Sequence, residues 1–410
     1  MQRVIQVNVY NNKEDLNKEY ELESLIKTAG AKTEIYISQV IDKPNPSFYI
    51  GKGKVFEIKD IAEKHDIKTC VFDVELSASQ VRNLEETMKI KVVDWTTLIL
   101  DIFAKRANTK ESKLKIHLAQ LKYQLPRLNK WFSYLSRQAG GIGTRGPGET
   151  MLETDRRAVV RDIKFLERKI KEVENTKRVN RKSRKNIINI SLLGYTNAGK
   201  STILNQCLKK YGMEKYVYSD DLLFATLDTS TRKLKLDKTN VTLTDTVGFI
   251  DNLSKELNDS FLTTIEEIKF ADILLVVIDA SKEDLSLQLD TIDNTIKDVG
   301  VSDKKIIYVF NKMDQVDNEL KIKAYERDKD RIYISAKNDL DIERLKEKIL
   351  NVIKKDYILA NIHIPYKNGD VLNYFLNHYD IRKKEFNEKE TILIAEISKV
   401  DYERYRKFIR

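Results

Sequence analysis

A glycine-bearing loop that ends in a lysine and a hydroxyl residue lies near the middle of the chain. Its sequence is Gly194-Tyr195-Thr196-Asn197-Ala198-Gly199-Lys200-Ser201, preceded by the apolar run 187–193 and followed by the helix-forming residues 202–208. Backbone N–H groups in such a loop can ring a phosphate, and the helix N-terminus adds a favourable field. We expect Lys200 to reach the β- and γ-phosphates of a nucleoside triphosphate, Ser201 to bind Mg²⁺, and Thr202 to complete the loop.

Three further motifs follow predicted strands of the same region: Asp245-Thr246-Val247-Gly248, Asn311-Lys312-Met313-Asp314 and Ser335-Ala336-Lys337. We expect Asp245 to hold Mg²⁺ through water and the Gly248 N–H to meet the γ-phosphate. The Asp314 carboxylate can accept both N1–H and the exocyclic amine of guanine, whereas adenine has no N1–H to offer. The third motif suits a backbone contact to guanine O6. Together the four motifs predict a GTP site.

The segment Phe224-Ala225-Thr226-Leu227-Asp228 lies between the loop and Asp245 and predicts a switch. Thr226 would coordinate Mg²⁺ only while a γ-phosphate is present, and the nearby Thr229 and Thr231 are alternatives for this role. Lys200, Thr226 and Gly248 form the expected catalytic set. Phe249 occupies the place where Ras-type enzymes carry a glutamine that orients water, so we expect slow intrinsic hydrolysis and stimulation by a partner. Asn197 either binds a monovalent cation such as K⁺ or stabilises the loop.

Composition sets the broad class of the protein. The chain has 410 residues, 33% of them charged, a net charge of +10 and two cysteines. Such a chain is globular, and its charge suits a polyanionic partner, although abundant surface lysine explains it equally well. The cysteine count fits a reducing cytoplasm. The start carries no apolar core of signal-peptide length, and no apolar run approaches the ~20 residues of a membrane span. A monomer satisfies all of these observations.

Four regions differ in their hydrophobic pattern. Residues 1–107 alternate short β-type runs with helical stretches and predict an α/β domain. Residues 108–186 carry two apolar series at helical spacing, typical of an antiparallel helical hairpin, with Pro126 expected to kink or break the first helix near Gln124. Residues 187–356 alternate strands and helices and predict a Ras-like, doubly wound P-loop domain. Residues 357–410 show a strand–helix–strand pattern and predict a small α+β domain.

The predicted hairpin has a glycine-rich tip, residues 140–149, beside a basic second helix. The tip is either a flexible hinge or a segment that lets backbone approach RNA closely while Arg145 pairs with phosphate. Residues 161–185 hold eleven Lys/Arg against four Asp/Glu, which favours a helix facing RNA over a merely solvated one. The candidate RNA contacts are Gly140, Gly141, Gly143, Arg145, Gly146, Gly148, Arg156, Arg157, Arg181, Lys182, Arg184 and Lys185.

Several stretches of the chain resemble the HflX GTPases of the Obg–HflX group. The similarity covers residues 1 to about 355. It is carried by Gly51–Lys54, Leu98–Phe103, Leu118–Leu128, Gly140–Glu149 with Glu153, Asp155, Arg156 and Arg157, Gly194–Thr202, Phe224–Asp228 and Asp245–Phe249. One departure is Trp95, where the family often has arginine. Some members are reported to bind ATP through the N-terminal domain, but residues 1–107 here contain no GxxxxGK[ST] loop.

The resemblance implies a role on the ribosome. HflX-like proteins bind the large (50S) subunit in the GTP state and split 70S ribosomes under stress, with hydrolysis stimulated by the ribosome. The tip of the hairpin would contact 23S rRNA near the peptidyl-transferase centre, and an apolar residue at the position of Phe249 is usual in the group. The alternative from another class is a nucleotide-gated RNA chaperone or ribosome-assembly factor.

Overall fold

The computed structural model of the protein describes residues 1–10, 17–138, 147–182, 187–212, 230–246, 248, 266–282, 285–316 and 330–410. The chain forms two compact units. The described residues before 183 belong to the first unit and those after 186 to the second. The predicted fold class, α/β with several parts, is confirmed.

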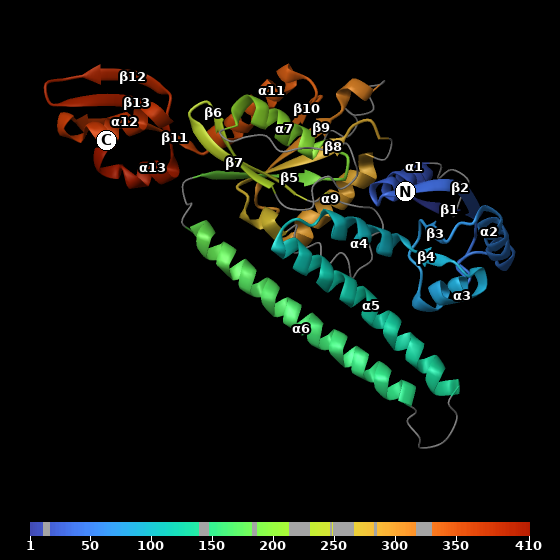
Figure 1. Ribbon diagram of the computed structural model, residues 1–410. Coiled ribbons are helices and arrows are strands. Elements are labelled where there is room, and N and C mark those ends of the chain that lie inside the picture. The colour runs from blue at the N-terminus through green and yellow to red at the C-terminus, as the bar shows by residue number, and fades with distance from the viewer. Residues whose placement is uncertain are drawn as a thin grey trace. The chain divides into compact units, whose positions relative to one another are not determined.

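The first unit begins with a parallel four-stranded sheet in the order β2-β1-β3-β4 (Figure 1). The strands are β1 (Gln2–Tyr10), β2 (Ala31–Val40), β3 (Thr69–Phe72) and β4 (Lys91–Val93). The helices that alternate with them are α1 (Asn17–Thr28), α2 (Lys52–His65), α3 (Ala78–Met88) and α4 (Trp95–Arg106). Strand residues Ile5 and Val7 pack with Cys70 and with residues of α2 and α3 in one apolar core, as the alternating pattern predicts.

A pair of long helices, α5 (Lys110–Gln138) and α6 (Pro147–Lys182), completes the first unit. Their seam is the pair of predicted apolar series: Leu118, Ile163, Leu166 and Ile170 form one buried cluster, with Leu114, Leu121, Leu125 and Val159 packed against it. Of the predicted kink or break near Gln124, the break is wrong, because α5 runs through Pro126 as one helix. The packing of α5 against α6 outweighs the one backbone hydrogen bond that proline cannot donate.

The second unit contains a six-stranded sheet in the order β10-β9-β8-β5-β7-β6, parallel except for the edge strand β6. The strands are β5 (Ile188–Gly194), β6 (Ser230–Leu236), β7 (Thr239–Asp245), β8 (Ile273–Asp279), β9 (Lys305–Asn311) and β10 (Arg331–Tyr333). Its helices include α7 (Lys200–Tyr211), α9 (Leu285–Val299) and α11 (Asp339–Lys354). The sequence predicts all of the parallel strands to within a few residues.

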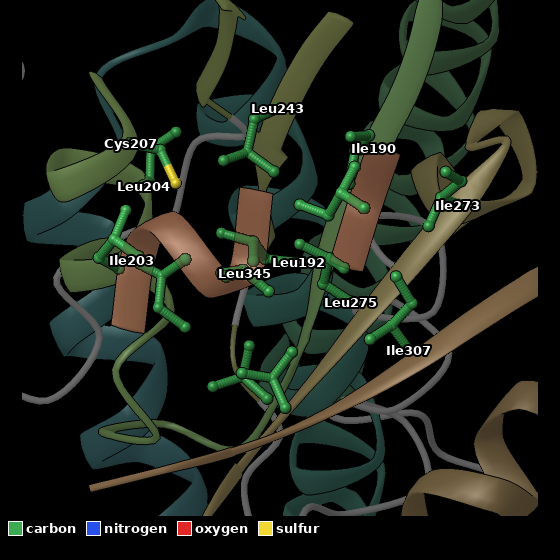
Figure 2. Close-up of a cluster of buried hydrophobic side chains, with 14 of the residues drawn as sticks. Ile190, Leu192, Ile203, Leu204, Cys207, Leu243, Ile273, Leu275, Ile307 and Leu345 are labelled. Atoms are coloured by element: carbon green, nitrogen blue, oxygen red, sulfur yellow. The ribbon is translucent and has the colours of Figure 1, made fainter. Parts of the chain in front are cut away.

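Apolar side chains from strands and helices meet in the core of this sheet. Figure 2 shows Leu192 of β5 and Leu275 of β8 beside Leu345 of α11, with Cys207 of α7 at one side. β8 is buried at every residue, as expected for a central parallel strand covered on both faces. This core fixes the carboxyl ends of five parallel strands at one edge, where doubly wound sheets bind their ligands.

A small domain follows α11 directly. Its strands β11 (Tyr357–Pro365), β12 (Ile381–Phe386) and β13 (Glu390–Ser398) form an antiparallel sheet in the order β11-β13-β12, with helices α12 (Gly369–His378) and α13 (Lys399–Arg404). Phe375 and Leu393 are fully buried in its core. The predicted strand–helix–strand pattern is present. β12 is an additional strand that the sequence did not predict, because it is mostly exposed and carries Arg382, Lys383 and Lys384 in succession.

Candidate nucleotide site

The loop after β5 adopts a conformation that its sequence requires. Gly199 has φ of +95°, and a Cβ at this position would lie 2.1 Å from the side-chain nitrogen, Nδ2, of Asn311. Glycine alone tolerates both conditions without strain. Helix α7 then begins at Lys200, so its N-terminus faces the loop. The predicted arrangement of strand, loop and helix is therefore present.

Lys200 lies across the loop with its side chain buried. Its Nζ donates to the carbonyl oxygens of Gly194, at 3.0 Å, and Tyr195, at 2.7 Å. Burial lowers the pKa of Lys200 to about 8, against the opposing attraction of Asp245. The ammonium group is thus costly to keep charged in this pocket, and phosphate oxygens are the ligands that would offset the cost.

Ser201 and Asp245 meet at the mouth of the loop. The Ser201 hydroxyl donates to Oδ2 of Asp245 at 2.7 Å, and Asp245 is fully buried. A hydroxyl and a carboxylate oxygen brought together in this way fit the oxygen ligands that Mg²⁺ prefers. Gly248 is close by, since a Cβ there would lie 2.7 Å from the Thr196 nitrogen and 2.8 Å from Lys200 Nζ.

Asn311 cross-links the loops of the site. Its Nδ2 donates to the Ala198 carbonyl at 2.8 Å, and its Oδ1 accepts from the Ala336 N–H at 2.9 Å. The side chain is nearly inaccessible to solvent. Asn311 therefore ties the phosphate-side loop to the Ser335–Lys337 segment. The sequence predicts Asn311 to be a site residue but gives no signal for this bracing role.

Asp314 is held by a neighbouring loop. The Ser335 hydroxyl donates to Oδ1 of Asp314 at 2.7 Å, and the Ser335 N–H donates to Asp341 at 2.8 Å. Lys312, with φ of +64°, pairs with Asp279 at the end of β8 at 2.7 Å. Asp279 is a residue that the motif analysis missed, although its place at a strand's carboxyl end is the relevant signal.

Several predicted site residues lie outside the described part of the chain: Phe224, Ala225, Thr226, Leu227, Asp228, Val247 and Phe249. Thr229, an alternative switch residue, also lies outside it. Thr231, the other alternative, is in β6, and its hydroxyl lies 3.0 Å from that of Thr244 across the sheet. This cross-strand contact gives Thr231 a role within the sheet.

The candidate RNA contacts of the helical hairpin also lie partly inside and partly outside the described residues. Gly140, Gly141, Gly143, Arg145, Gly146, Arg184 and Lys185 lie outside the described residues, whereas Gly148, Arg181 and Lys182 fall within α6. Arg156 and Arg157 are exposed on α6. Further along the helix, the exposed residues Arg161, Lys164, Arg168 and Lys171 follow at steps of three and four, which places them on one helix face.

A buried polar junction joins α5 to the sheet of the first unit. The Asp94 carboxylate caps α4 and accepts hydrogen bonds from Leu76 N–H, the Tyr123 hydroxyl and Arg127, the last at 3.0 Å. The Arg127 guanidinium also lies over the Tyr123 ring, 3.4 Å from its centroid. Burial raises the pKa of Tyr123 far above its ordinary value, so the hydroxyl stays protonated. Trp95, beside Asp94, is buried.

Comparison with known proteins decides the family. Three family models match consecutive parts of the chain: "GTP-binding GTPase N-terminal" at residues 17–104, "GTP-binding GTPase Middle Region" at 106–184 and "50S ribosome-binding GTPase" at 189–312. GTPase HflX of Caldanaerobacter subterraneus subsp. tengcongensis is 41% identical, covering 100% of this chain and 94% of the relative. The chain belongs to the HflX family of GTPases.

Other relatives agree. GTPase HflX of Alkalihalophilus pseudofirmus is 42% identical over 97% of this chain and 93% of its own length. The Escherichia coli GTPase HflX is 34% identical over 95% and 92%. A solved structure described as a complex of SsGBP and GDP is similar in fold, with a TM-score of 0.52 and 24% identity, covering 87% of this chain and 99% of that one.

The predicted GTP-binding protein is thus confirmed as a GTPase, an enzyme that hydrolyses GTP. P-loop GTPases generally use Mg²⁺, and Ser201 with Asp245 provides oxygen ligands suited to it. Within the described residues, no helix is both long enough and apolar enough to cross a membrane.

Proposed function

We propose that this HflX-family GTPase is a cytoplasmic monomer that binds the 50S ribosomal subunit in its GTP state and splits 70S ribosomes. In this proposal the ribosome stimulates GTP hydrolysis, and hydrolysis permits release. The function would serve ribosome rescue and recycling under stress. The observation that carries the proposal is the exposed basic face of α6.

The two faces of α6 have opposite chemistry. One face holds Ile163, Leu166 and Ile170 in the seam with α5. The other exposes Arg161, Lys164, Arg168 and Lys171 to solvent. By contrast, Lys169 pairs with Glu172 at 2.9 Å, and Lys122 of α5 pairs with Glu167 at 2.8 Å. A row of cations along a stiff helix suits the phosphate backbone of an RNA such as 23S rRNA.

Phe165 adds a second kind of contact on α6. Its side chain is 48% exposed. The guanidinium of Arg168 lies 5.7 Å and the ammonium of Lys169 5.9 Å from its ring centroid. An exposed aromatic ring among cations can stack on an unpaired base. We propose that the glycine-rich tip, residues 140–149, contacts 23S rRNA near the peptidyl-transferase centre, with α6 following the backbone beyond it.

The nucleotide site would supply the switch. Lys200 would bind the β- and γ-phosphates, and Asp314 would bind guanine, with Ser335 fixing one carboxylate oxygen. Ser201, Asp245 through water and Thr226 would hold Mg²⁺, which neutralises phosphate charge when bound. Gly248 is near enough to Lys200 for its N–H to approach the γ-phosphate. Loss of that phosphate would release Thr226 and, with it, the binding-competent state.

Stimulation by a partner follows from the residue at position 249. Phe249 cannot hydrogen-bond a water molecule, so a group on the ribosome would complete the site. Asn197, whose φ is +61°, is our candidate ligand for K⁺ beside the phosphates. Equal turnover in K⁺ and Na⁺ buffers would exclude the K⁺ site and leave the rest of the proposal unchanged.

The test is GTP turnover alone and with purified 50S, 30S and 70S particles, with sedimentation profiles in parallel. We expect strong stimulation by 50S, little by 30S, and conversion of 70S particles to subunits in proportion to the protein added. A non-hydrolysable GTP analogue should suffice for splitting. Turnover indifferent to 50S, with 70S particles intact, would contradict the proposal and favour an RNA chaperone or ribosome-assembly factor.

A further inference from the structure

The β6–β7 hairpin connects the nucleotide site to the C-terminal domain. Its antiparallel register runs from the pair Ser230–Asp245 at one end to the pair Leu236–Thr239 at the other. Asp245 contacts Ser201 in the site at 2.7 Å. The opposite end is the turn at Asp237 and Lys238, where Asp237 has φ of +52°. β6 lies at the edge of the sheet, and β7 is the strand that pairs with it among the described residues.

The C-terminal domain contacts this turn through Lys238. Lys238 Nζ donates to the Tyr379 carbonyl at 2.9 Å and lies 3.6 Å from Asp380. Lys354, at the end of α11, lies 3.4 Å from the other Asp380 oxygen. Asp380 therefore lies between Lys238 of the β6–β7 turn and Lys354 of α11. All three residues line a cavity of about 220 Å³. Figure 1 shows this end of β6 and β7 beside the small domain.

Tyr357 links the six-stranded sheet and the C-terminal domain by contacting the apolar cores of both. It packs against the apolar core of the six-stranded sheet and against that of the C-terminal domain. Its ring contacts Tyr379 edge to face, with centroids 5.8 Å apart. The small domain is thus joined to the turn between β6 and β7 through Lys238, with Tyr357 packed against both cores.

We propose that Lys238 is a positioning residue for the GTPase reaction, through which the C-terminal domain holds the β6–β7 hairpin and thereby the Asp245 carboxylate. The antiparallel ladder runs without a register shift from the turn to the Ser230–Asp245 pair, so we expect a shift of the turn to reach that pair. Mg²⁺ requires near-ideal octahedral geometry, and small displacements of Asp245 weaken its hold. The C-terminal domain, residues 357–410, thereby acts in the GTPase reaction.

The test compares single substitutions in the full-length protein. Lys238→Met removes the cation at similar side-chain length, Asp380→Asn removes its partner's charge, and Lys238→Arg retains the charge. Lys384→Met is the matched control, because Lys384 is on exposed β12 and its Nζ lies 4.9 Å from the centroid of the Phe386 ring. The measurement is the release rate of a fluorescent GDP analogue across a Mg²⁺ titration, with no ribosome present.

We expect Lys238→Met and Asp380→Asn each to speed GDP release about three- to fivefold at low Mg²⁺, the size appropriate to a partly exposed pair. Both should need more Mg²⁺ to slow release, and with EDTA all variants should release alike. The double variant should release GDP about as fast as either single variant, and clearly more slowly than the product of the two effects predicts, because both changes cut one contact. Lys238→Arg and Lys384→Met should stay within about twofold of the parent.

Two outcomes would overturn the proposal. One is unchanged release in both Lys238→Met and Asp380→Asn while their thermal midpoints stay within about 3 °C of the parent. The other is the same acceleration with and without Mg²⁺, since that would indicate general loosening of the fold. Neither outcome bears on ribosome splitting, which is measured separately.

Discussion

The nucleotide site and the helical hairpin use polar residues in opposite ways. In the site, polar side chains are buried and bonded to one another: Asn311 joins two loops, Ser335 holds Asp314, and Ser201 holds Asp245. On α6, Arg161 and Arg168 point to solvent on the face away from the apolar seam. The nucleotide site is held in place by its own hydrogen bonds, without a ligand. The exposed face of α6, in contrast, provides positive charge whose arrangement can adapt to a partner.

This difference follows from the ligands. A nucleotide is small, so affinity and base selection require groups fixed at hydrogen-bonding distance. An RNA surface is large and repeats its phosphates, so several loosely held cations suffice. We expect substitutions in the braced site to act strongly and one residue at a time. Substitutions on α6 should act through accumulated charge and depend on salt.

The largest effect should come from Asp314→Asn. The amide cannot accept from both N1–H and the exocyclic amine of guanine, so GTP affinity should fall about a thousandfold or more. Affinity for xanthosine triphosphate, whose C2 carbonyl can accept from the new amide, should rise. Competition binding of the two nucleotides measures both changes, and unaltered GTP affinity would place the guanine contact elsewhere.

On the hairpin, Arg161→Glu with Arg168→Glu should weaken 50S binding about a hundredfold near physiological salt. The plot of log affinity against log salt should become shallower by about two. Intrinsic GTP turnover should not change. The matched control reverses the exposed residues Lys32 and Lys64, also in the first unit. An equal loss of binding in both double variants would show that general charge, not the α6 face, attracts the ribosome.

Asn311→Ala tests whether the site is braced. Removing the amide leaves the Ala198 carbonyl and the Ala336 N–H without their shared partner, at a cost of about 1–3 kcal/mol. GDP affinity should fall about tenfold to thirtyfold, because the loops lose their mutual alignment. Asn351→Ala, an exposed position on α11, is the control. The brace would be disproved if both variants bound GDP and unfolded in urea like the parent.

The smallest effect is a pH dependence from Lys200. The pKa of Lys200 is about 8 in the folded protein against an ordinary 10.5. Phosphate binds the protonated form, so GDP affinity should decline above pH 8, by about tenfold between pH 7 and 9. Guanosine lacks phosphate, and the ratio of the two affinities isolates Lys200. A ratio constant over this range would mean that the ammonium keeps its ordinary pKa.

The same shift affects stability without nucleotide. Below pH 8 Lys200 is charged in both the folded and unfolded states, and the cost of burying the charge is fully present. Between about pH 8 and 10.5 the folded state holds fewer protons than the unfolded state, so the free energy of unfolding rises with pH from this group. Urea unfolding of the nucleotide-free protein at pH 7.5 and 9 would measure the contribution.

The sequence predicts those parts of the molecule that depend on neighbouring residues. The loop 194–201 and the strand before it form one local unit, and the apolar series of α5 and α6 predict their own seam. Asn311 braces residues 113 and 25 positions away, and no local pattern encodes such pairs. The same holds for Asp94, whose partners Tyr123 and Arg127 belong to a different helix.

Two further differences have clear physical causes. β12 escapes prediction because an edge strand of a small sheet can be polar almost throughout, and its pairing with β13 supplies what its own pattern lacks. Pro126 suggests a helix end, but packing along the seam keeps α5 continuous. In both cases tertiary contacts outweigh local preference.

Both cysteines of the chain are enclosed by apolar side chains, Cys70 on β3 of the first unit and Cys207 on α7 of the second. Burial raises the pKa of Cys207 to about 12, and that of Cys70 also lies well above its ordinary value. Neither thiolate forms near neutral pH, so maleimide reagents should not react with either cysteine. A single cysteine introduced on the surface could then carry a dye in the otherwise native sequence, and two such positions would report distances between the units by fluorescence energy transfer.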